Sequence, residues 1–453
     1  MRILLAVALP ALCLAPAGQA RKPNIIFIMA DDLGYGDLSC YGQKKFATPR
    51  LDRMATEGTR FTQYYAGSTV CAPSRSVLMT GLHTGHTRIR GNARQPLLPE
   101  DVTVAEVLRS AGYATGIMGK WGLGEDGSTG IPNRQGFDEW FGYLDQAHAH
   151  RHYTDHLFRN EEKVKVDPEK DYTHDLFTEE ALKFVRKNKE NPFFLYLAYT
   201  VPHAELRVPE DSLKEFRGKF PEKPFTNAAA DKHPSVGYRS QKEPNAALAA
   251  MVTRLDRDVG RLLDLLKDLG VDGDTLVLFT SDNGPHKEGG RDPAFFESSG
   301  PLRGIKRDLT DGGIRVPMIA RWPGRVPAGR CSDQVWSHCD FLATAADAAG
   351  SKAYPGDGLS MLPALLGKEQ KPHEFLYWEF HEKGFQQAVR VGDWKGIRAS
   401  VGAPLDLFNL KDDIGEKDNV AAKHPEVVSK IEAYLKTART ESEHWPVKAG
   451  GKK

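Results

Sequence analysis

Four short runs of the chain are almost entirely apolar and rich in β-branched or aromatic residues. They are NIIFIM (24–29), ATGIM (114–118), FFLYLAY (193–199) and TLVLFT (275–280). Strands as uniformly apolar as these are usually buried on both faces of a parallel sheet. The four runs therefore predict the central strands of one mostly parallel sheet.

Between these runs, apolar residues recur at helical spacing. Thr48 and Pro49 open one such pattern as a cap and a first-turn proline. The longest pattern covers 245–269 and stops at Gly270. The polar segment 204–243, rich in proline and charge, predicts a long loop that is functional or disordered. Strands that alternate with helices predict an α/β sandwich around a mostly parallel sheet.

The pattern changes after about residue 368. Three stretches of short alternating strands (FLYWEF, QAVRVGDWKGIRA and PLDLFNL) precede a helical pattern from His424 to about Thr437. We therefore predict a main domain over 21–368 and a smaller C-terminal subdomain over 369–453, with an antiparallel sheet and a terminal helix.

The first twenty residues, MRILLAVALPALCLAPAGQA, combine one basic residue, an apolar run and small residues near the end. This pattern predicts a signal peptide, 1–20, cleaved after Ala20, and hence an exported protein that is periplasmic or secreted. No later run is long and apolar enough for a membrane anchor. The chain of 453 residues has 61 Lys+Arg against 60 Asp+Glu. This balance creates no overall field that would recruit nucleic acid.

Four cysteines remain beyond the predicted cleavage point, too few for a disulfide framework in a chain of this length. They are Cys40, Cys71, Cys331 and Cys339. Cys331 and Cys339 could pair in an oxidising compartment, which the sequence leaves open.

Cys71 opens the stretch CAPSRSVLMTG. Pro73 is preset for a first helical turn, so Cys71 lies at the positive end of a helix dipole beside free backbone N–H groups. Arg75 lies four residues on, on the same helical face. A buried small hydrophobe and a thiolate nucleophile are two other interpretations of Cys71, but they account less well for Pro73 and Arg75.

Polar residues follow each of the four apolar runs. Asp31 and Asp32 follow the first, and Asp282 and Asn283 follow the fourth. Adjacent carboxylates repel unless a cation neutralises them, and ligands bind beyond the carboxyl ends of parallel strands. An all-oxygen ligand set predicts calcium, with magnesium second. Turn capping is the alternative for either pair alone.

Several motifs together resemble the sulfatase family. CAPSR followed by LMTG resembles the family signature, whose cysteine is oxidised to formylglycine during export. NIIFIMADDLGYGDL and TSDNG look like its two metal pairs, and LRGIKRDLTDGGIRVP looks like the segment with its sulfate-binding lysine, here Lys306. DLFNLKDDIGEKDNVAAKHPE looks like its closing motif. The resemblance covers nearly the whole mature chain and implies the alkaline phosphatase-like fold, with 21–368 as the catalytic domain.

The resemblance implies a sulfuric ester hydrolase that removes sulfate from a sulfated sugar or glycan. One hydroxyl of the hydrated formylglycine attacks sulfur, and the other then drives elimination of sulfate. The aldehyde implies a partner, either a formylglycine-generating or an anaerobic sulfatase-maturing enzyme. The residues that the resemblance assigns are Cys71 (modified, catalytic and a metal ligand), Asp31, Asp32, Asp282 and Asn283 (metal), Arg75 (holding the hydrate), Lys120 and Lys306 (sulfate oxygens), and His203 (protonating the departing alcohol).

One position departs from the family pattern. Most sulfatases read Gly-Lys-Trp-His-Leu-Gly after the second strand, whereas this chain reads GKWGLG and has Gly122 in place of the histidine. We expect His148 or His150, in the stretch AHAHRHYTDH, to fill that gap and to contact substrate. Alternatively, the glycine admits water or a bulkier sugar. The stretch GYLDQAHAHRHYTDHLFRNEEKV is similar to bacterial arylsulfatases and N-acetylgalactosamine-6-sulfatases, which favours a sulfated glycan.

Two other functions are compatible with the sequence. A phosphonate or phosphodiester hydrolase of the same superfamily can share the modified cysteine. A catalytically inactive relative could keep the fold and the calcium site and bind glycans.

Overall fold

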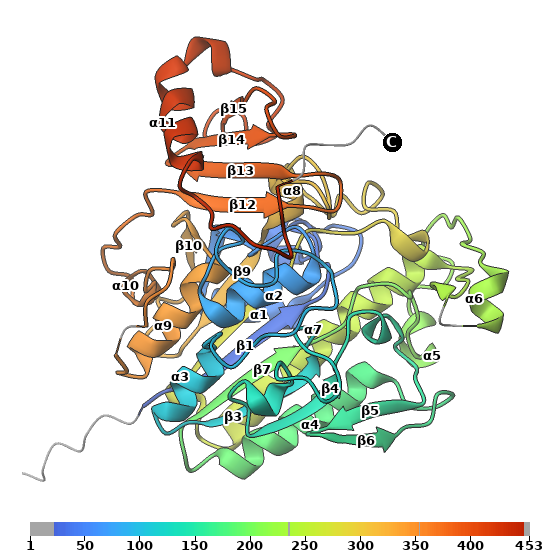
Figure 1. Ribbon diagram of the computed structural model, residues 1–453. Coiled ribbons are helices and arrows are strands. Elements are labelled where there is room, and N and C mark those ends of the chain that lie inside the picture. Colours follow the sequence, from blue (N-terminus) through green and yellow to red (C-terminus); the bar gives the residue numbers. More distant parts are fainter. Residues whose placement is uncertain (1–21, 234–235, 353, 448–453) are drawn as a thin grey trace, which may run out of the picture.

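Strand β1 (Asn24–Ala30) lies inside a large sheet and is buried along its whole length. It pairs in parallel with β7 (Phe193–Ala198) on one side and with β8 (Thr275–Ser281) on the other. β3 (Ala114–Lys120) pairs in parallel with β7. These are the four strands that the apolar runs predict. The computed structural model describes residues 22–233, 236–352 and 354–447 (Figure 1).

The full sheet is mixed but mostly parallel. Its order is β10-β2-β9-β8-β1-β7-β3-β4-β5-β6, with β11 beside β2. β9 is antiparallel to both β8 and β2, and β5 is antiparallel to both β4 and β6. The strands that the apolar runs did not predict are β2 (Thr59–Tyr65), β4 (Glu139–Tyr143), β5 (His156–Arg159), β6 (Glu162–Lys165), β9 (Arg315–Arg321), β10 (Arg330–Ser332) and β11 (Trp336–Ser337).

Helices cover both faces of this sheet, which makes the predicted α/β sandwich. Ile26 and Ile28 of β1 share one core with α1 (Pro49–Thr56), α4 (Thr173–Asn188) and α7 (Pro244–Asp268). Ile25 and Phe27 share the opposite core with α2 (Cys71–Thr80), α3 (Val104–Ser110) and α9 (Phe341–Ala348). Successive side chains of a strand point to opposite faces, so an apolar run of this kind requires a helix layer on each side.

The predicted loop 204–243 contains two short helices, α5 (Glu210–Leu213) and α6 (Ala228–Lys232). Phe225 and Gln241 form an isolated antiparallel bridge that closes its second half. In Figure 1 this segment projects from one side of the main body. Two further short helices, α8 (Asp311–Ile314) and α10 (Leu362–Leu365), lie in the last third of the chain.

A separate four-stranded antiparallel sheet follows, as predicted, at the top of Figure 1. Its strands are β12 (Leu376–Phe380), β13 (Gln386–Val391), β14 (Trp394–Arg398) and β15 (Asp406–Asn409). Val389 and Leu407 pack with Ile431 of α11 (Pro425–Leu435), the predicted terminal helix. Trp378 on β12 shares a cluster with Ile314 at the end of α8. The small sheet thus packs against the segment that leads away from Lys306.

Two sequence expectations concern cysteines and export. All four described cysteines are free thiols, so the Cys331–Cys339 pair left open above is not formed. Cys331 is exposed on β10, whereas Cys339 is buried and its thiol donates to the carbonyl of Gly81 (3.1 Å). Within the described ranges, no helix has the length and apolarity needed to cross a bilayer. The predicted signal peptide, 1–20, lies outside the described residues.

Candidate active site

Cys71 is the first residue of α2 and is only 2% exposed. The amide N–H of Ala72 donates to the Asn92 side chain (2.9 Å), which satisfies one of the free donors at this helix start. The Cys71 sulfur lies 3.5 Å from Asp31 Oδ1 and 3.6 Å from Lys306 Nζ. The predicted helix N-terminus therefore holds Cys71 among charged groups.

Two acidic pairs meet beside Cys71, because β1 and β8 are neighbours in register. Asp31 and Asp32 follow the end of β1, and Asp282 and Asn283 follow the end of β8. The amide N–H of Asp32 donates to Asp282 Oδ1 (3.0 Å), and Asn283 Nδ2 donates to Asp32 Oδ1 (2.6 Å). All four side chains are fully buried.

Each carboxylate has a buried cation as its partner. The nearest contacts are Arg75 Nη2 to Asp282 Oδ2 (2.8 Å), Lys120 Nζ to Asp31 Oδ2 (2.6 Å) and Lys306 Nζ to Asp32 Oδ2 (2.8 Å). Arg75 also donates to the carbonyl of Lys120 (2.9 Å), which joins α2 to the end of β3. The three cations come from distant parts of the chain and converge on one edge of the sheet.

This crowding shifts the pKa values within the site. Burial would raise the pKa of Asp31, but Lys120 and Arg75 outweigh burial and hold it well below its usual range. Burial and the neighbouring Asp31 raise the pKa of Asp282 to about 7. Burial likewise raises the pKa of the Cys71 thiol above its ordinary value, so the thiol is protonated at neutral pH. The thiolate interpretation of Cys71 therefore lacks electrostatic support.

The donor set fits a hard divalent cation. Oδ1 of Asn283 is buried and has no hydrogen-bond partner, which leaves one oxygen free for an ion. Among the described residues, Asp31, Asp32, Cys71 and His203 each bring one ligand atom, and these atoms lie within 4.8 Å of one another. Carboxylate and amide oxygens are the ligands that calcium and magnesium prefer.

His203 lies on the other side of Lys306. Its Nδ1 donates to the carbonyl of Ala204 (2.5 Å), which leaves Nε2 to accept from Lys306 Nζ (3.1 Å). Burial and Lys306 lower the pKa of His203 well below its usual value, so the ring is neutral. The ring stacks between those of His150 and His286, with centroid distances of 4.2 Å and 5.1 Å.

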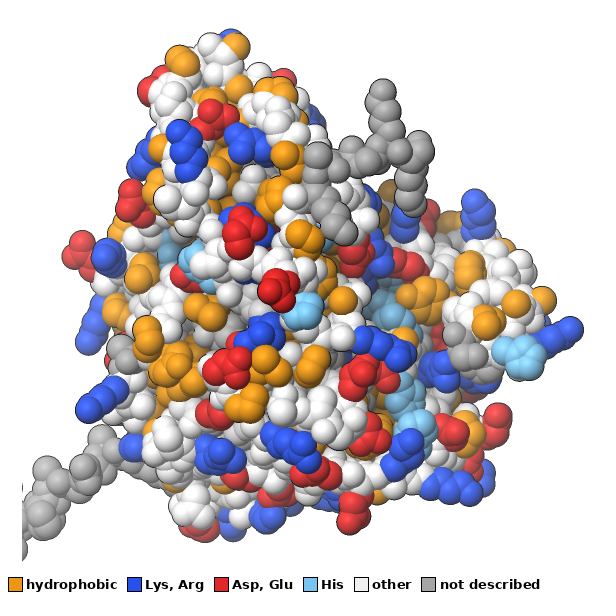
Figure 2. Space-filling model, viewed as in Figure 1, with side chains coloured by type: hydrophobic (Ala, Val, Ile, Leu, Met, Phe, Trp, Pro, Cys, Tyr) orange, Lys and Arg blue, Asp and Glu red, His pale blue; other side chains and the backbone are white. Residues whose placement is uncertain are grey.

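The structure brings one of the two expected loop histidines into the site. His150 reaches His203, whereas His148 hydrogen bonds to Thr154 (2.7 Å) and packs against His156. Figure 2 shows histidine side chains gathered on the face beside the projecting segment that carries α5 and α6.

The space beside Gly122 is taken by a glutamine. A Cβ at Gly122 would fall 1.9 Å from Nε2 of Gln146. Gln146, Gly122 and Asn92 line a cavity of about 190 Å³ that adjoins the start of α2. The side chain nearest to the Cβ position of residue 122 is therefore that of Gln146, two residues before His148.

Sequence reasoning missed several residues around this centre. Tyr238 lies over His150 and His203, with ring centroids 5.6 Å and 5.9 Å away. Arg291 donates to the carbonyl of Asp32 (2.8 Å) and supports the turn after β1. His286 follows the second acidic pair by three residues, a spacing that could have indicated it. Tyr238 lies in an aperiodic segment and gave no signal.

The comparisons with known proteins agree with this geometry. The family model described as "Sulfatase" matches residues 23–351, and the model of the N-sulphoglucosamine sulphohydrolase C-terminal region matches residues 305–441. The chain belongs to the sulfatase family and is a sulfuric ester hydrolase.

Named relatives and a solved structure support this assignment along most of the chain. The chain is 32% identical to N-acetylgalactosamine-6-sulfatase of Canis lupus familiaris, over 86% of this chain and 74% of that protein. It is 31% identical to N-acetylgalactosamine-6-O-sulfatase of Bacteroides thetaiotaomicron, over 93% of this chain and 94% of that protein. Among solved structures, the chain resembles the crystal structure of Ps i-CgsB in complex with k-i-k-neocarrahexaose, with 30% sequence identity and a TM-score of 0.79. The match covers 94% of this chain and 95% of that one.

The contact between Gly122 and Gln146 makes a testable prediction. Gly122 has a φ of +78°, so Gly122→Ala adds backbone strain of about 1–2 kcal/mol as well as a clash with Gln146. Gly127 has a φ of +75° and nothing within 4 Å of its Cβ position, so Gly127→Ala adds the strain alone. In urea denaturation, Gly122→Ala should lose more free energy of unfolding than Gly127→Ala, because Gln146 has to swing away and give up its hydrogen bond to the carbonyl of Gly122 (3.4 Å).

Adding Gln146→Ala to Gly122→Ala should remove that difference. Equal stability of the two single variants would show that Gln146 does not occupy this space.

Proposed function

We propose that this protein is an exported sulfatase that removes sulfate from a sulfated sugar through a formylglycine made from Cys71. The observation that carries the proposal is the buried constellation around Cys71, in which three cations and four oxygen-bearing side chains surround one thiol. A buried, protonated thiol is a poor nucleophile, so this setting suits a cysteine that is converted before use. The names of the relatives favour a sulfated glycan as substrate.

The formylglycine hydrate would supply two hydroxyl groups, one to attack sulfur and one to expel sulfate. Lys120 and Lys306 are placed to bind the sulfate oxygens, whose charge shifts in the transition state. Arg75 lies on the same face of α2 as Cys71 and holds the carboxylate of Asp282 in position. Formation of the aldehyde requires a formylglycine-generating or anaerobic sulfatase-maturing enzyme, and the predicted signal peptide is consistent with maturation during export.

His203 is the group placed to protonate the departing alcohol. The hydrogen bond to Ala204 fixes the ring so that Nε2 faces Lys306 and the thiol of Cys71. The ring is neutral in the free site, but an anionic sulfate ester favours the protonated form by charge attraction. Lys306 donates to Nε2 and is therefore positioned to return the proton that His203 gives away.

Asp31, Asp32, Asp282 and Asn283 would hold calcium, with magnesium as the second choice. The free Oδ1 of Asn283 and the raised pKa of Asp282 support a cation at this position. Bound calcium would supply positive charge that favours the ionised hydroxyl of the hydrate.

Replacing Cys71 tests the proposed chemistry. Cys71→Ala should lower kcat for a sulfated sugar by more than about a thousandfold, because the precursor of the nucleophile is lost. Mass spectrometry of the Cys71 peptide from wild-type protein, expressed with a maturation enzyme, should show an aldehyde in place of the thiol. Cys331→Ala changes an exposed cysteine and should leave turnover unchanged. A folded Cys71→Ala protein with wild-type turnover would falsify the proposal.

Metal removal gives an independent prediction with a readout other than activity. After chelation, added calcium should raise the Tm, with about 2.7 kcal/mol of stabilisation at a hundredfold excess over Kd. Asn283→Ala should weaken this shift, whereas Asn191→Ala, which changes an exposed amide, should not. The assignment fails if zinc raises the Tm and calcium does not.

A further inference from the structure

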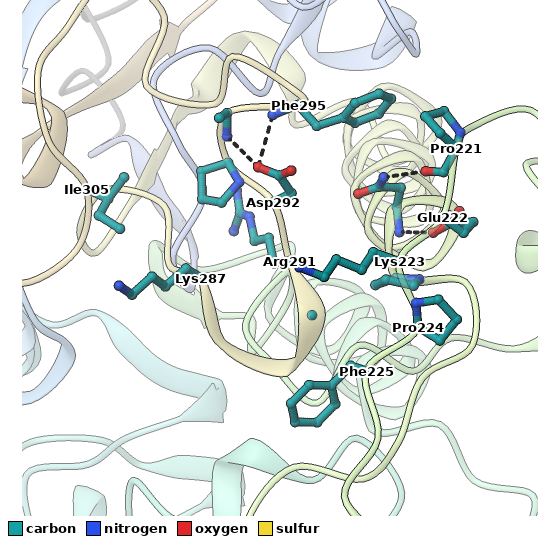
Figure 3. A pocket seen from close by; sticks show the side chains of 15 residues that line it. Pro221, Glu222, Lys223, Pro224, Phe225, Lys287, Arg291, Asp292, Phe295 and Ile305 are labelled. Carbon is teal, nitrogen blue, oxygen red and sulfur yellow. Dashed lines mark hydrogen bonds between the residues drawn. The ribbon is translucent and has the colours of Figure 1, made fainter.

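One pocket lies beside the active site rather than over it. It has a volume of about 660 Å³ and lies between residues 221–225, the start of α7 and residues 287–295. Figure 3 shows Phe225 and Phe295 at opposite ends of the pocket, with Lys223 reaching across it toward Arg291. Of these residues, only Arg291 contacts the site described above, through its hydrogen bond to the carbonyl of Asp32 (2.8 Å).

The pocket is continuous with the active site along the chain. Ile305 lines the pocket, and the next residue is the catalytic candidate Lys306. Lys287 also lines it and follows His286, whose ring stacks on His203. Gly289, in the same segment 287–295, packs against Ala204, the residue after His203, so the pocket adjoins the His203 side of the site.

The acidic groups of the pocket are already engaged. Both oxygens of the Glu222 carboxylate accept from backbone amides at the start of α7, Asn245 at 2.9 Å and Ala246 at 2.8 Å. Asp292 Oδ1 accepts from the amides of Ala294 and Phe295. These hydrogen bonds turn the two carboxylates toward the protein backbone.

The two lysines of the pocket are available to a ligand. Lys223 and Lys287 are exposed, and neither ammonium group has an ion-pair partner within the described part of the chain. Arg291 is not available in the same way: it is only 3% exposed, and its Nη atoms donate to Asp37 and to the carbonyl of Asp32. Only its Nε is buried without a hydrogen-bond partner. A buried donor without a partner is costly unless a ligand or water satisfies it. Phe225 and Phe295 add half-buried aromatic surface suited to the apolar face of a sugar ring.

We propose that this pocket binds a second, anionic sugar of a glycan chain, next to the sugar that carries the reactive sulfate. This inference rests on the proposed sulfatase function and makes the enzyme selective for oligosaccharides over monosaccharides. The recognised chemistry is a negative charge on the neighbouring sugar, which either a sulfate or a carboxylate can supply.

The test compares four substrates that share the same reactive sulfated sugar. One is the monosaccharide, and three are disaccharides whose second sugar is neutral, carboxylated or sulfated. Wild-type protein should show a kcat/KM about tenfold higher for at least one anionic disaccharide than for the neutral one. The two anionic substrates reveal which anion the pocket prefers.

Variants connect this selectivity to the pocket. We define selectivity as kcat/KM for the preferred anionic disaccharide divided by kcat/KM for the neutral one. The double variant with Lys223→Ala and Lys287→Ala should lower this ratio by about tenfold. Lys242→Ala, an exposed lysine of the same segment that does not line the pocket, should keep the wild-type ratio.

The two proposals fail in different ways. If wild-type protein hydrolyses the sulfated sugars and the double variant keeps the wild-type ratio, the pocket assignment is wrong and the sulfatase function stands. If wild-type protein hydrolyses none of the four substrates, the proposed function and the pocket assignment are both wrong.

Discussion

The structure depends on placing three carboxylates within a few ångströms of one another in the protein interior. Asp31, Asp32 and Asp282 are fully buried, and each requires a positive partner, because an unpaired buried charge costs several kcal/mol. Arg75, Lys120 and Lys306 supply these partners. The arrangement gathers three positive charges beside Cys71, where we propose that the sulfate ester binds.

The fold meets this constraint by ending several elements at one edge of the sheet. β1 and β8 pair in parallel and deliver the two acidic pairs side by side, while β3, two strands from β1, ends in Lys120. α2 begins at the same edge with Cys71 and brings Arg75 one turn later. The small antiparallel sheet supports the site indirectly, because its buried Lys395 pairs with Asp311 (2.7 Å), five residues beyond Lys306.

The sequence predicted the central strands and the flanking helices, because a run buried on both faces leaves a clear apolar pattern. The acidic pairs were found by their places after those strands, whereas Lys306 and the role of Cys71 came from the resemblance to the sulfatase family. It did not predict β9, whose run RVPMIAR is interrupted by Pro317 and charged at both ends. Nor could it place Gln146 against Gly122 or Tyr238 over His203. Those contacts depend on how the loops fold across the sheet edge. Loop conformation leaves no periodic pattern in the sequence, so it could not be predicted.

The central claim, that the nucleophile attacks sulfur and leaves the C–O bond of the sugar intact, is tested most directly by hydrolysing a sulfated sugar in water enriched in oxygen-18. The hydroxyl groups of an aldehyde hydrate exchange with water, so attack on sulfur breaks the S–O bond and transfers the label to sulfate. The account predicts labelled sulfate and an unlabelled sugar hydroxyl, as measured by mass spectrometry of both products. Label in the sugar hydroxyl would show cleavage of the C–O bond and would contradict it.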